Sequence, residues 1–247
     1  MPETKLDIAI AGGTAQAFLF TPSSGTGPWP GVLYLTDIFG IRPAYHGMAQ
    51  RLADKGFAVL MPNAFFRAGP LPLFDFAPQL GEERTMKRFL ELRAGLPNDA
   101  MGPDGAAYAE FLLAQKTVKG PKVGVAGYCF TGQMAVRAAS AAPDRIAAAA
   151  SFHGGNLYTD QPDSPHLLLP KIKARLYFGH ATNDHSISAD AIAKLEAALA
   201  AWGGAYESET YPAAHGWCVP GREGISDAVQ ADRAFAKLVE LLDAALR

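Results

Sequence analysis

The sequence is poor in cysteine and contains neither a long apolar run nor a run of like charges. Only two of its 247 residues are cysteines, Cys129 and Cys218, and residues 1–5 include no apolar stretch resembling a signal peptide. A disulfide-stabilised secreted protein is therefore not indicated, and we expect a cytoplasmic protein with reduced thiols. No apolar run approaches the ~18 residues that a membrane-spanning helix needs, so a membrane partner is not expected.

Charge and histidine spacing exclude two further classes of protein. The formal net charge is −2, and without a basic patch neither nucleic acid nor an anionic membrane surface is an expected partner. The six histidines do not show the spacing of a zinc site, so we expect no metal, and no organic cofactor is implied. The expected partner is a small molecule, bound by a monomer or a small homo-oligomer.

Composition and pattern together predict one α/β domain spanning residues 1–247. Apolar residues make up 49% of the chain, enough for a large core at this length. Strand-like and helix-like segments alternate without a linker or repeat, which predicts a doubly wound, mostly parallel sheet with helices on both faces and no large inserted cap. We expect strands at 6–10, 15–20, 31–36, 57–62, 122–126, 146–152, 175–179 and 206–211, and helices at 44–55, 81–94, 99–115, 133–139, 189–202 and 226–246.

A sharp turn between a predicted strand and a predicted helix carries Cys129. Residues 127–132 read Gly-Tyr-Cys-Phe-Thr-Gly, after an apolar run and before a helix-like segment. This order is typical of the nucleophile elbow of α/β-hydrolases, with cysteine in place of serine. The turn raises the sulfur above the sheet edge and brings it close to amides at a helix N-terminus, which favour a thiolate. A buried structural cysteine is the alternative interpretation.

Asp184 and His215 follow later strands in the order that an elbow nucleophile requires. A cysteine nucleophile needs a base, and the base needs an acid to orient it. In α/β-hydrolases the acid and then the histidine come after the nucleophile in the chain. Asp184 lies in the loop after the predicted strand 175–179, and His215 lies in the loop after strand 206–211. Because ligands bind at the carboxyl ends of strands in open α/β sheets, we predict a Cys129–His215–Asp184 triad.

The chain resembles the dienelactone hydrolases (carboxymethylenebutenolidases) over nearly its whole length. The most specific segments are the Asp184 loop, residues 37–41 (Asp-Ile-Phe-Gly-Ile), residues 127–132 and residues 214–216 (Ala-His-Gly). The resemblance implies an α/β-hydrolase fold and the hydrolysis of an ester or lactone.

The same resemblance implies a role for each site residue. It makes Cys129 the nucleophile, His215 its base and Asp184 the acid that orients the imidazole. It also implies that the backbone amides of Ile38 and Phe130 form the oxyanion hole.

Three positions depart from the pattern of that family. Thr131 stands where the elbow usually has glycine, and Val219 stands where an arginine usually grips a substrate carboxylate. Dienelactone itself is therefore not the expected substrate. Asp37 stands where a glutamate pairs with the resting thiol, and it either performs that catalytic role with a shorter reach or caps the turn before Gly40.

Aromatic residues near the triad suggest an apolar pocket. The long loop 63–80 is rich in phenylalanine, and we expect it to fold over the strand ends and form a pocket wall. The alternative for each candidate is a place in the core or on the solvated surface. The candidate pocket residues are Phe39, Tyr128, Phe130 and Trp217, with Arg42 and Arg67 as candidates to hold an anionic substrate group.

The predicted reaction is cleavage of a small ester or lactone through an acyl-Cys129 intermediate. His215 protonates the leaving alkoxide and then activates water for deacylation. The alternatives are a promiscuous esterase or phosphotriesterase, an acyl-transferring enzyme on the same triad, and a non-catalytic binding protein of hydrolase fold. Cys218 follows His215 closely in the chain and either lines the pocket or forms a disulfide with Cys129.

Overall fold

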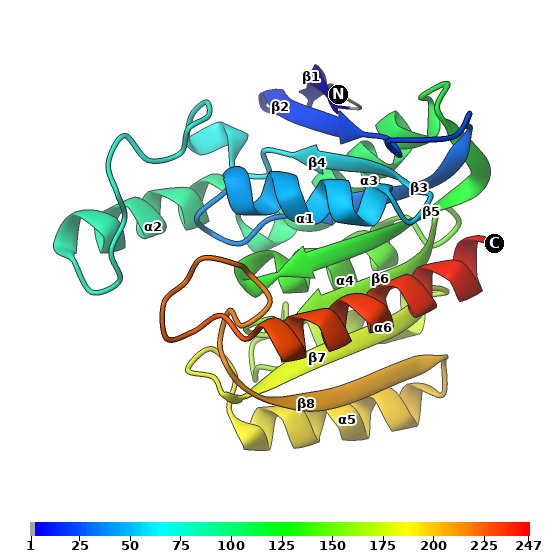
Figure 1. The fold of residues 1–247 in the computed structure, drawn as a ribbon. Helices are drawn as coiled ribbons and strands as arrows, with labels where there is room; N and C mark the ends of the chain where they lie inside the picture. Colours follow the sequence, from blue (N-terminus) through cyan, green and yellow to red (C-terminus); the bar gives the residue numbers. More distant parts are fainter. Residues whose placement is uncertain (1–2) are drawn as a thin grey trace.

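The strands form one mixed sheet that places several carboxyl ends side by side. The computed structural model describes residues 3–247, and its eight-stranded sheet has the order β1-β2-β4-β3-β5-β6-β7-β8 (Figure 1). The pairs β1–β2 and β2–β4 are antiparallel, and the remaining pairs are parallel. The strands are β1 (Glu3–Ile10), β2 (Gly13–Phe20), β3 (Trp29–Leu35), β4 (Ala58–Pro62), β5 (Val118–Tyr128), β6 (Ile146–Phe152), β7 (Arg175–Asn183) and β8 (Tyr206–Ala214).

Helices cover both faces of the sheet, as the sequence predicted. Helices α1 (Pro43–Ala53) and α6 (Ala228–Leu246) lie on one face, in front of the sheet in Figure 1. Helices α3 (Asn98–Leu113), α4 (Gly132–Ala141) and α5 (Ala189–Trp202) pack in the other layer, and α2 (Glu83–Gly95) joins that layer near the strand ends. No helix among residues 3–247 is long and apolar enough to cross a membrane.

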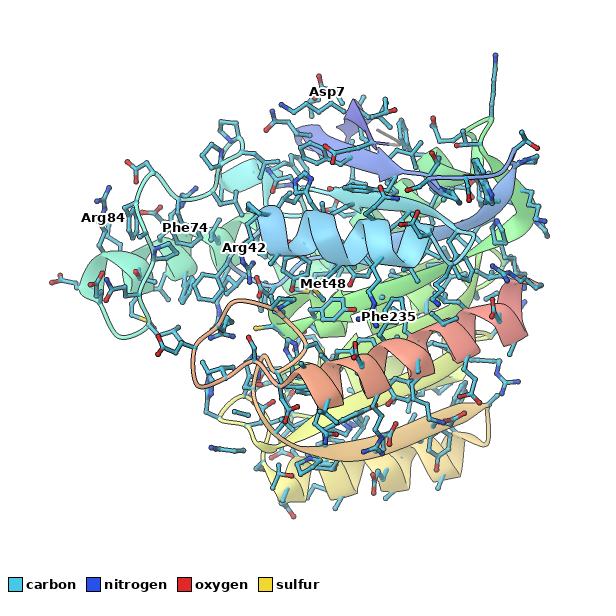
Figure 2. All side chains as sticks on the ribbon, viewed as in Figure 1. Asp7, Arg42, Met48, Phe74, Arg84 and Phe235 are labelled. Carbon is cyan, nitrogen blue, oxygen red and sulfur yellow. The ribbon has the colours of Figure 1, made fainter. Side chains whose placement is uncertain are left out.

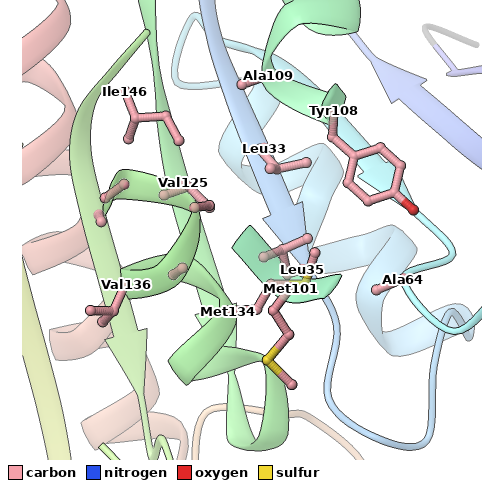
Figure 3. Packing of buried hydrophobic residues seen from close by; sticks show 14 of the residues in the cluster. Leu33, Leu35, Ala64, Met101, Tyr108, Ala109, Val125, Met134, Val136 and Ile146 are labelled. Atoms are coloured by element: carbon pink, nitrogen blue, oxygen red, sulfur yellow. The ribbon is translucent and has the colours of Figure 1, made fainter. Parts of the chain in front are cut away.

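The alternation of side chains along each strand builds the two cores. Successive side chains of a strand point to opposite faces, so Leu33 and Leu35 of β3 join the core beneath α3 and α4, where Figure 3 shows them beside Val125. Val32 and Tyr34 of the same strand join the core beneath α1 and α6. Both faces are apolar because both are buried, which is typical of a parallel sheet.

The order in which the chain adds parallel strands reverses between β3 and β5, and a crevice for a ligand is expected at this switch point. Strand β3 pairs with β4 on one side and with β5 on the other, so the connections after β3 and β5 diverge and leave a crevice at their carboxyl ends. In Figure 1, the loop after β4 and the loop after β8 approach this same end of the sheet.

Strands β7 and β8 are longer than the sequence predicted, and this changes the position of two site residues. Their pairing continues through a register shift to Asn183 and Ala214, and Thr182 Oγ1 donates a hydrogen bond to the Tyr211 carbonyl at 2.9 Å. Asp184 and His215 therefore come directly after strand ends. Two adjacent rigid strands fix their backbones more firmly than free loops would.

The outer strand β8 carries charges and a proline. Glu207 pairs with Lys237 of α6 at 3.0 Å, and Glu209 pairs with Arg233 of the same helix. Pro212 is exposed and supplies no backbone N–H for pairing. At the other border, β1 exposes Lys5 and Asp7.

Candidate active site

Cys129 occupies a strained turn between β5 and α4. Its φ is +56°, a left-handed conformation that costs a non-glycine residue about 1–3 kcal/mol and marks functional turns. A short 3₁₀ turn, η2 (Cys129–Thr131), leads from the strand into α4. The turn leaves no space for a side chain on the glycine at either side, because a Cβ at Gly127 would overlap the Thr131 carbonyl and one at Gly132 would meet Gly154.

His215 bridges the Cys129 sulfur and the Asp184 carboxylate. Its Nε2 lies 3.1 Å from Sγ of Cys129, and its Nδ1 lies 2.8 and 2.9 Å from the two oxygens of Asp184. The backbone N–H of His215 donates to the Asn183 carbonyl at 2.9 Å, which ties the ends of β7 and β8 together. The structure therefore brings together the three residues that the sequence predicted for the triad.

Ser186 supports this array and was missed by the sequence analysis. Its backbone amide and its hydroxyl lie 2.7 and 2.6 Å from Oδ1 of Asp184, and its hydroxyl lies 3.2 Å from Nδ1 of His215. A carboxylate that accepts several hydrogen bonds is fixed in position and in its charged form. A serine two residues after a candidate acid was the sequence signal for this contact.

Hydrogen bonding keeps the array charged. Burial lowers the pKa of His215, but its hydrogen bonds with Asp184 and Cys129 raise the pKa to about 10. Burial raises the pKa of Asp184, yet the hydrogen bonds from His215 and Ser186 bring the pKa below its usual value. His215 therefore keeps its proton at neutral pH between the Asp184 carboxylate and the Cys129 sulfur.

Asp37 caps a turn, as one of its two sequence interpretations expected, and it also pairs with Arg42. Its carboxylate accepts hydrogen bonds from both terminal nitrogens of Arg42, at 2.6 and 2.8 Å. Oδ1 also accepts a hydrogen bond from the Phe39 amide at 3.0 Å. The Gly40 amide closes the turn on the Asp37 carbonyl at 2.9 Å. Both carboxylate oxygens of Asp37 are therefore engaged by Arg42.

Thr131 joins the two loops that contain Ile38 and Phe130. Its hydroxyl lies 2.9 Å from the Thr36 carbonyl and 3.1 Å from the Leu35 carbonyl. The hydroxyl also accepts a hydrogen bond from the Tyr128 amide at 3.1 Å. The threonine that departs from the family pattern thus connects the elbow to the end of β3, and it is fully buried there.

Phe39 lines a groove of about 730 Å³ together with Arg42, the partner of Asp37. The loop after β4 supplies one wall through Leu73, Phe74 and Phe76, so its predicted place as a pocket wall agrees with the structure. Arg222 supplies part of the opposite rim and lies over the Phe39 ring at 5.5 Å. Figure 2 shows Arg42 and Phe74 at this end of the molecule.

Three other candidate pocket residues have different positions. Tyr128 is buried, shares a hydrogen bond of 2.8 Å with the Tyr34 hydroxyl and lines a separate cavity of about 410 Å³ between α1 and α6. Trp217 is 0% exposed and stacks on Tyr211. The guanidinium of Arg67 pairs with Asp104 at 2.6 Å, beside the β1–β2 turn.

Both cysteines are free thiols, so the disulfide alternative for Cys218 is not observed. Cys218 is buried and lines the cavity between α1 and α6 together with Tyr128. Burial raises the pKa of this thiol well above its usual value, which makes it unreactive.

His153 is a second buried histidine at the array, and the sequence analysis did not identify it. It follows β6 directly, and its ring centroid lies 4.9 Å from that of His215. Burial and the charge of His215 lower the pKa of His153 well below its usual value, so its ring is neutral. Its position after an apolar strand was the same signal that pointed to Asp184 and His215.

The fold and the array define an α/β-hydrolase. The sequence profile of the dienelactone hydrolase family matches residues 15–246, and the chain belongs to that family and is an ester hydrolase. It is 28% identical to the carboxymethylenebutenolidase of Pseudomonas sp. over 74% of this chain and 71% of that protein. A 31% match to the carboxymethylenebutenolidase of Rhodococcus opacus covers 51% of this chain and 44% of that protein.

Solved structures agree on the fold. A structure from Klebsiella pneumoniae superimposes with a TM-score of 0.84 at 21% identity over 98% of both chains. A dienelactone hydrolase-like promiscuous phosphotriesterase from metagenomic libraries gives 0.79 at 21% identity, over 99% of this chain and 98% of that one. At this level of identity the likeness concerns the fold.

Proposed function

We propose that the chain cleaves a small carboxylic ester or lactone through an acyl-Cys129 intermediate, with His215 as base and Asp184 as the orienting acid. The observation that carries this proposal is the continuous hydrogen-bonded line from Sγ through the imidazole to the carboxylate, with 3.1 Å and 2.8 Å between its members. Geometry of this kind, rather than position in the sequence, defines a nucleophile–base–acid array.

The reaction proceeds in two acyl-transfer steps. The thiolate of Cys129 attacks the carbonyl carbon, and the tetrahedral intermediate collapses as the His215 imidazolium gives its proton to the leaving alkoxide. The imidazole, now neutral, takes a proton from water, and the resulting hydroxide attacks the thioester. Collapse of the second intermediate releases the acid and restores the thiolate–imidazolium pair. A reduced thiol is required throughout, so a reducing compartment such as the cytoplasm suits this chemistry.

The backbone amides of Ile38 and Phe130 are the proposed oxyanion donors. Both residues lie beside the contact by which Thr131 connects the elbow to the end of β3. Fixed donors of this kind stabilise the charge that develops on the carbonyl oxygen, and loss of one typically costs about 3 kcal/mol.

The groove favours a substrate with an apolar body. Phe39, Phe74 and Phe76 supply its aromatic wall, and such walls bind apolar groups of small ligands. Val219 is fully buried, and the Arg42 guanidinium is engaged by Asp37. Arg222 is therefore the cation on the rim that is best placed to meet an anionic substrate group.

Hydrolysis of p-nitrophenyl esters of increasing chain length tests the proposal. We expect turnover by the wild type and by Cys218→Ser, and a loss of about 10³-fold or more in Cys129→Ser and His215→Ala. Mass spectrometry of the quenched reaction should show an acyl group on Cys129. Full activity in either site variant would contradict the triad. An inactive but folded wild type would instead favour the transfer or binding alternatives.

A further inference from the structure

His153 has a buried imidazole without a hydrogen-bond partner. The residue is 0% exposed, and neither Nδ1 nor Nε2 has a partner among residues 3–247. A buried polar group left in this state costs about 1–3 kcal/mol and calls for an explanation such as a bound ion. The backbone of His153 is also strained, with φ at +41°. An uncompensated polar group in a strained conformation indicates a functional position.

The ring of His153 shares a small space with two other metal-binding side chains. One ligand atom each from Cys129, His153 and His215 lies within 4.8 Å of the others. Zinc bonds of ~2.3 Å to sulfur and ~2.0–2.1 Å to nitrogen place tetrahedral ligand atoms about 3.5 Å apart. The cluster therefore closes around a zinc ion with side-chain movements of about 1 Å.

Asp184 orients the His215 ring so that Nε2 can also act as a metal ligand. The Asp184 carboxylate forms a hydrogen bond with Nδ1 of His215 at 2.8 Å, so Nε2 of the same ring points toward Sγ of Cys129. A histidine that ligates a metal through one nitrogen almost always donates its other N–H to a carboxylate or carbonyl. The array thus supplies a thiolate and two imidazoles, with a carboxylate behind one of them.

We propose that Cys129, His153 and His215 form a Zn²⁺ site and that bound zinc reversibly blocks the nucleophile. The ion forms bonds to Sγ and to one nitrogen of each imidazole, and the proton shared by Sγ and Nε2 of His215 is released to solvent. Water occupies the fourth position, as in zinc sites with three protein ligands. The spacing of histidines along the chain does not reveal this site, because each ligand follows a different strand.

The two parts of the inference have separate foundations. Zinc binding rests on the geometry of the three side chains, whereas inhibition rests also on the proposed function of Cys129. A thiolate bonded to zinc does not attack an ester carbonyl, and the imidazole bonded to it does not transfer protons. Cys129 is partly exposed, which gives the ion a path to the cluster.

Titration of the metal-free protein with Zn²⁺ against a chromophoric chelator tests the binding directly. We expect one ion per chain with a Kd in the micromolar range or tighter, and a release of about one proton. Binding should weaken at least tenfold in Cys129→Ser and in His153→Ala. His185→Ala is the matched control, because His185 also lies beside His215, with ring centroids 5.1 Å apart, and it should bind like the wild type.

Two readouts on the wild type do not depend on variants that fold. The Co²⁺ complex should show a thiolate-to-cobalt absorption band in the near ultraviolet, and Zn²⁺ should protect Cys129 from iodoacetamide until a chelator is added. Absence of binding at 100-fold molar excess of Zn²⁺, or equal weakening by His185→Ala, would overturn the inference. Binding without inhibition of ester hydrolysis would overturn only its second part. An inactive enzyme that still binds zinc would count against the proposed function alone.

Discussion

Substitution of Ser186 tests how the position of the Asp184 carboxylate affects catalysis. The Ser186 hydroxyl lies 2.6 Å from Oδ1 of Asp184, and a hydrogen bond to a charged group contributes about 1.5–3 kcal/mol. We expect Ser186→Ala to lower kcat about tenfold with little change in KM, because the serine holds Asp184 and does not touch the groove. The measurement is steady-state ester hydrolysis across pH.

Ser188→Ala is the matched control for that change. The Ser188 side chain accepts the Ala191 amide at 3.2 Å and caps α5, so its loss should cost about 1 kcal/mol of stability and leave kcat unchanged. If Ser186→Ala behaved in the same way, its contacts with Asp184 would be structural only.

The charge of His215 gives a second prediction, read by NMR. Its pKa of about 10 depends on hydrogen bonds with Asp184 and Cys129, so its ring should stay protonated through neutral pH and titrate near pH 10. In Cys129→Ser the sulfur is absent, and the pKa should fall by about one unit or more. A wild-type titration near pH 6.5 would contradict the thiolate–imidazolium pair.

The same pairing makes stability depend on pH. The pKa of His215 is raised from 6.5 in the folded state, so the contribution to stability is fully present below pH 6.5. It is lost as the pH rises through about 10. Chemical denaturation of the wild type should therefore show a decrease over this range that is smaller in Cys129→Ser.

At the residue scale, the sequence predicted the site residues that directly follow a strand in the chain. Cys129, Asp184 and His215 each follow a strand, and the carboxyl ends of parallel strands converge. Partners from distant segments were not predictable, because nothing near Arg67 in the chain points to Asp104. Tyr128 was wrongly predicted to line the pocket beside Cys129. It is the last residue of β5, and its side chain points into the core beneath α1 and α6.

At the scale of elements, Thr131 determines how the elbow sits against the end of β3. Thr131→Val keeps the shape of the side chain but removes the hydroxyl, which leaves the buried Tyr128 amide without its acceptor. We expect a loss of about 1–3 kcal/mol in the free energy of unfolding and a fall in kcat, because the loops of Ile38 and Phe130 lose their connection. Urea denaturation and ester hydrolysis measure the two effects.

Thr131→Ser provides the comparison for this prediction. Serine keeps the hydroxyl and loses a methyl group, so hydrolysis should recover most of the wild-type rate. Equal rates in the valine and wild-type proteins would show that the two loops keep their positions without this contact.

The ends of several strands were not predicted from the sequence, and β7 and β8 are the two that affect the site. The last residues of β7 and β8 are polar or small, such as Thr182, Asn183 and Ala213, and so lack the apolar alternation of a strand. Backbone pairing extends the strands nonetheless. Backbone hydrogen bonds between neighbouring strands carry no side-chain signal. Helix α5, in contrast, was predicted over its full length, and the structure shows Ser188 at its N-cap and Gly203 at its C-cap.

At the scale of the whole molecule, the layered sheet followed from the alternation of apolar strands and amphipathic helices. The groove followed only in part: Phe39 and the loop after β4 were expected to line a pocket, whereas the contribution of Arg222 from the loop after β8 was not. Which loops meet at one end of a sheet can be predicted only from the strand order, and that order depends on long-range packing.

The charged border strand gives a prediction for the molecule in concentrated solution. Glu207 is exposed on β8, where charge discourages pairing with the edge of another copy. Glu207→Val should increase self-association with rising concentration, measured by sedimentation velocity. Glu240→Val, which adds the same apolar group on the exposed face of α6, should not. Equal association by both variants would attribute the effect to added hydrophobicity rather than to the edge.

Charges and a proline on β8, with charges on β1, also decide how copies of the protein can meet while folded. Neither border offers a clean row of backbone groups for another strand, so the native state is a poor template for fibril growth. Aggregation of this protein should then begin from partly unfolded chains. Its rate should follow the population of those chains, and substitutions that stabilise the fold should suppress it.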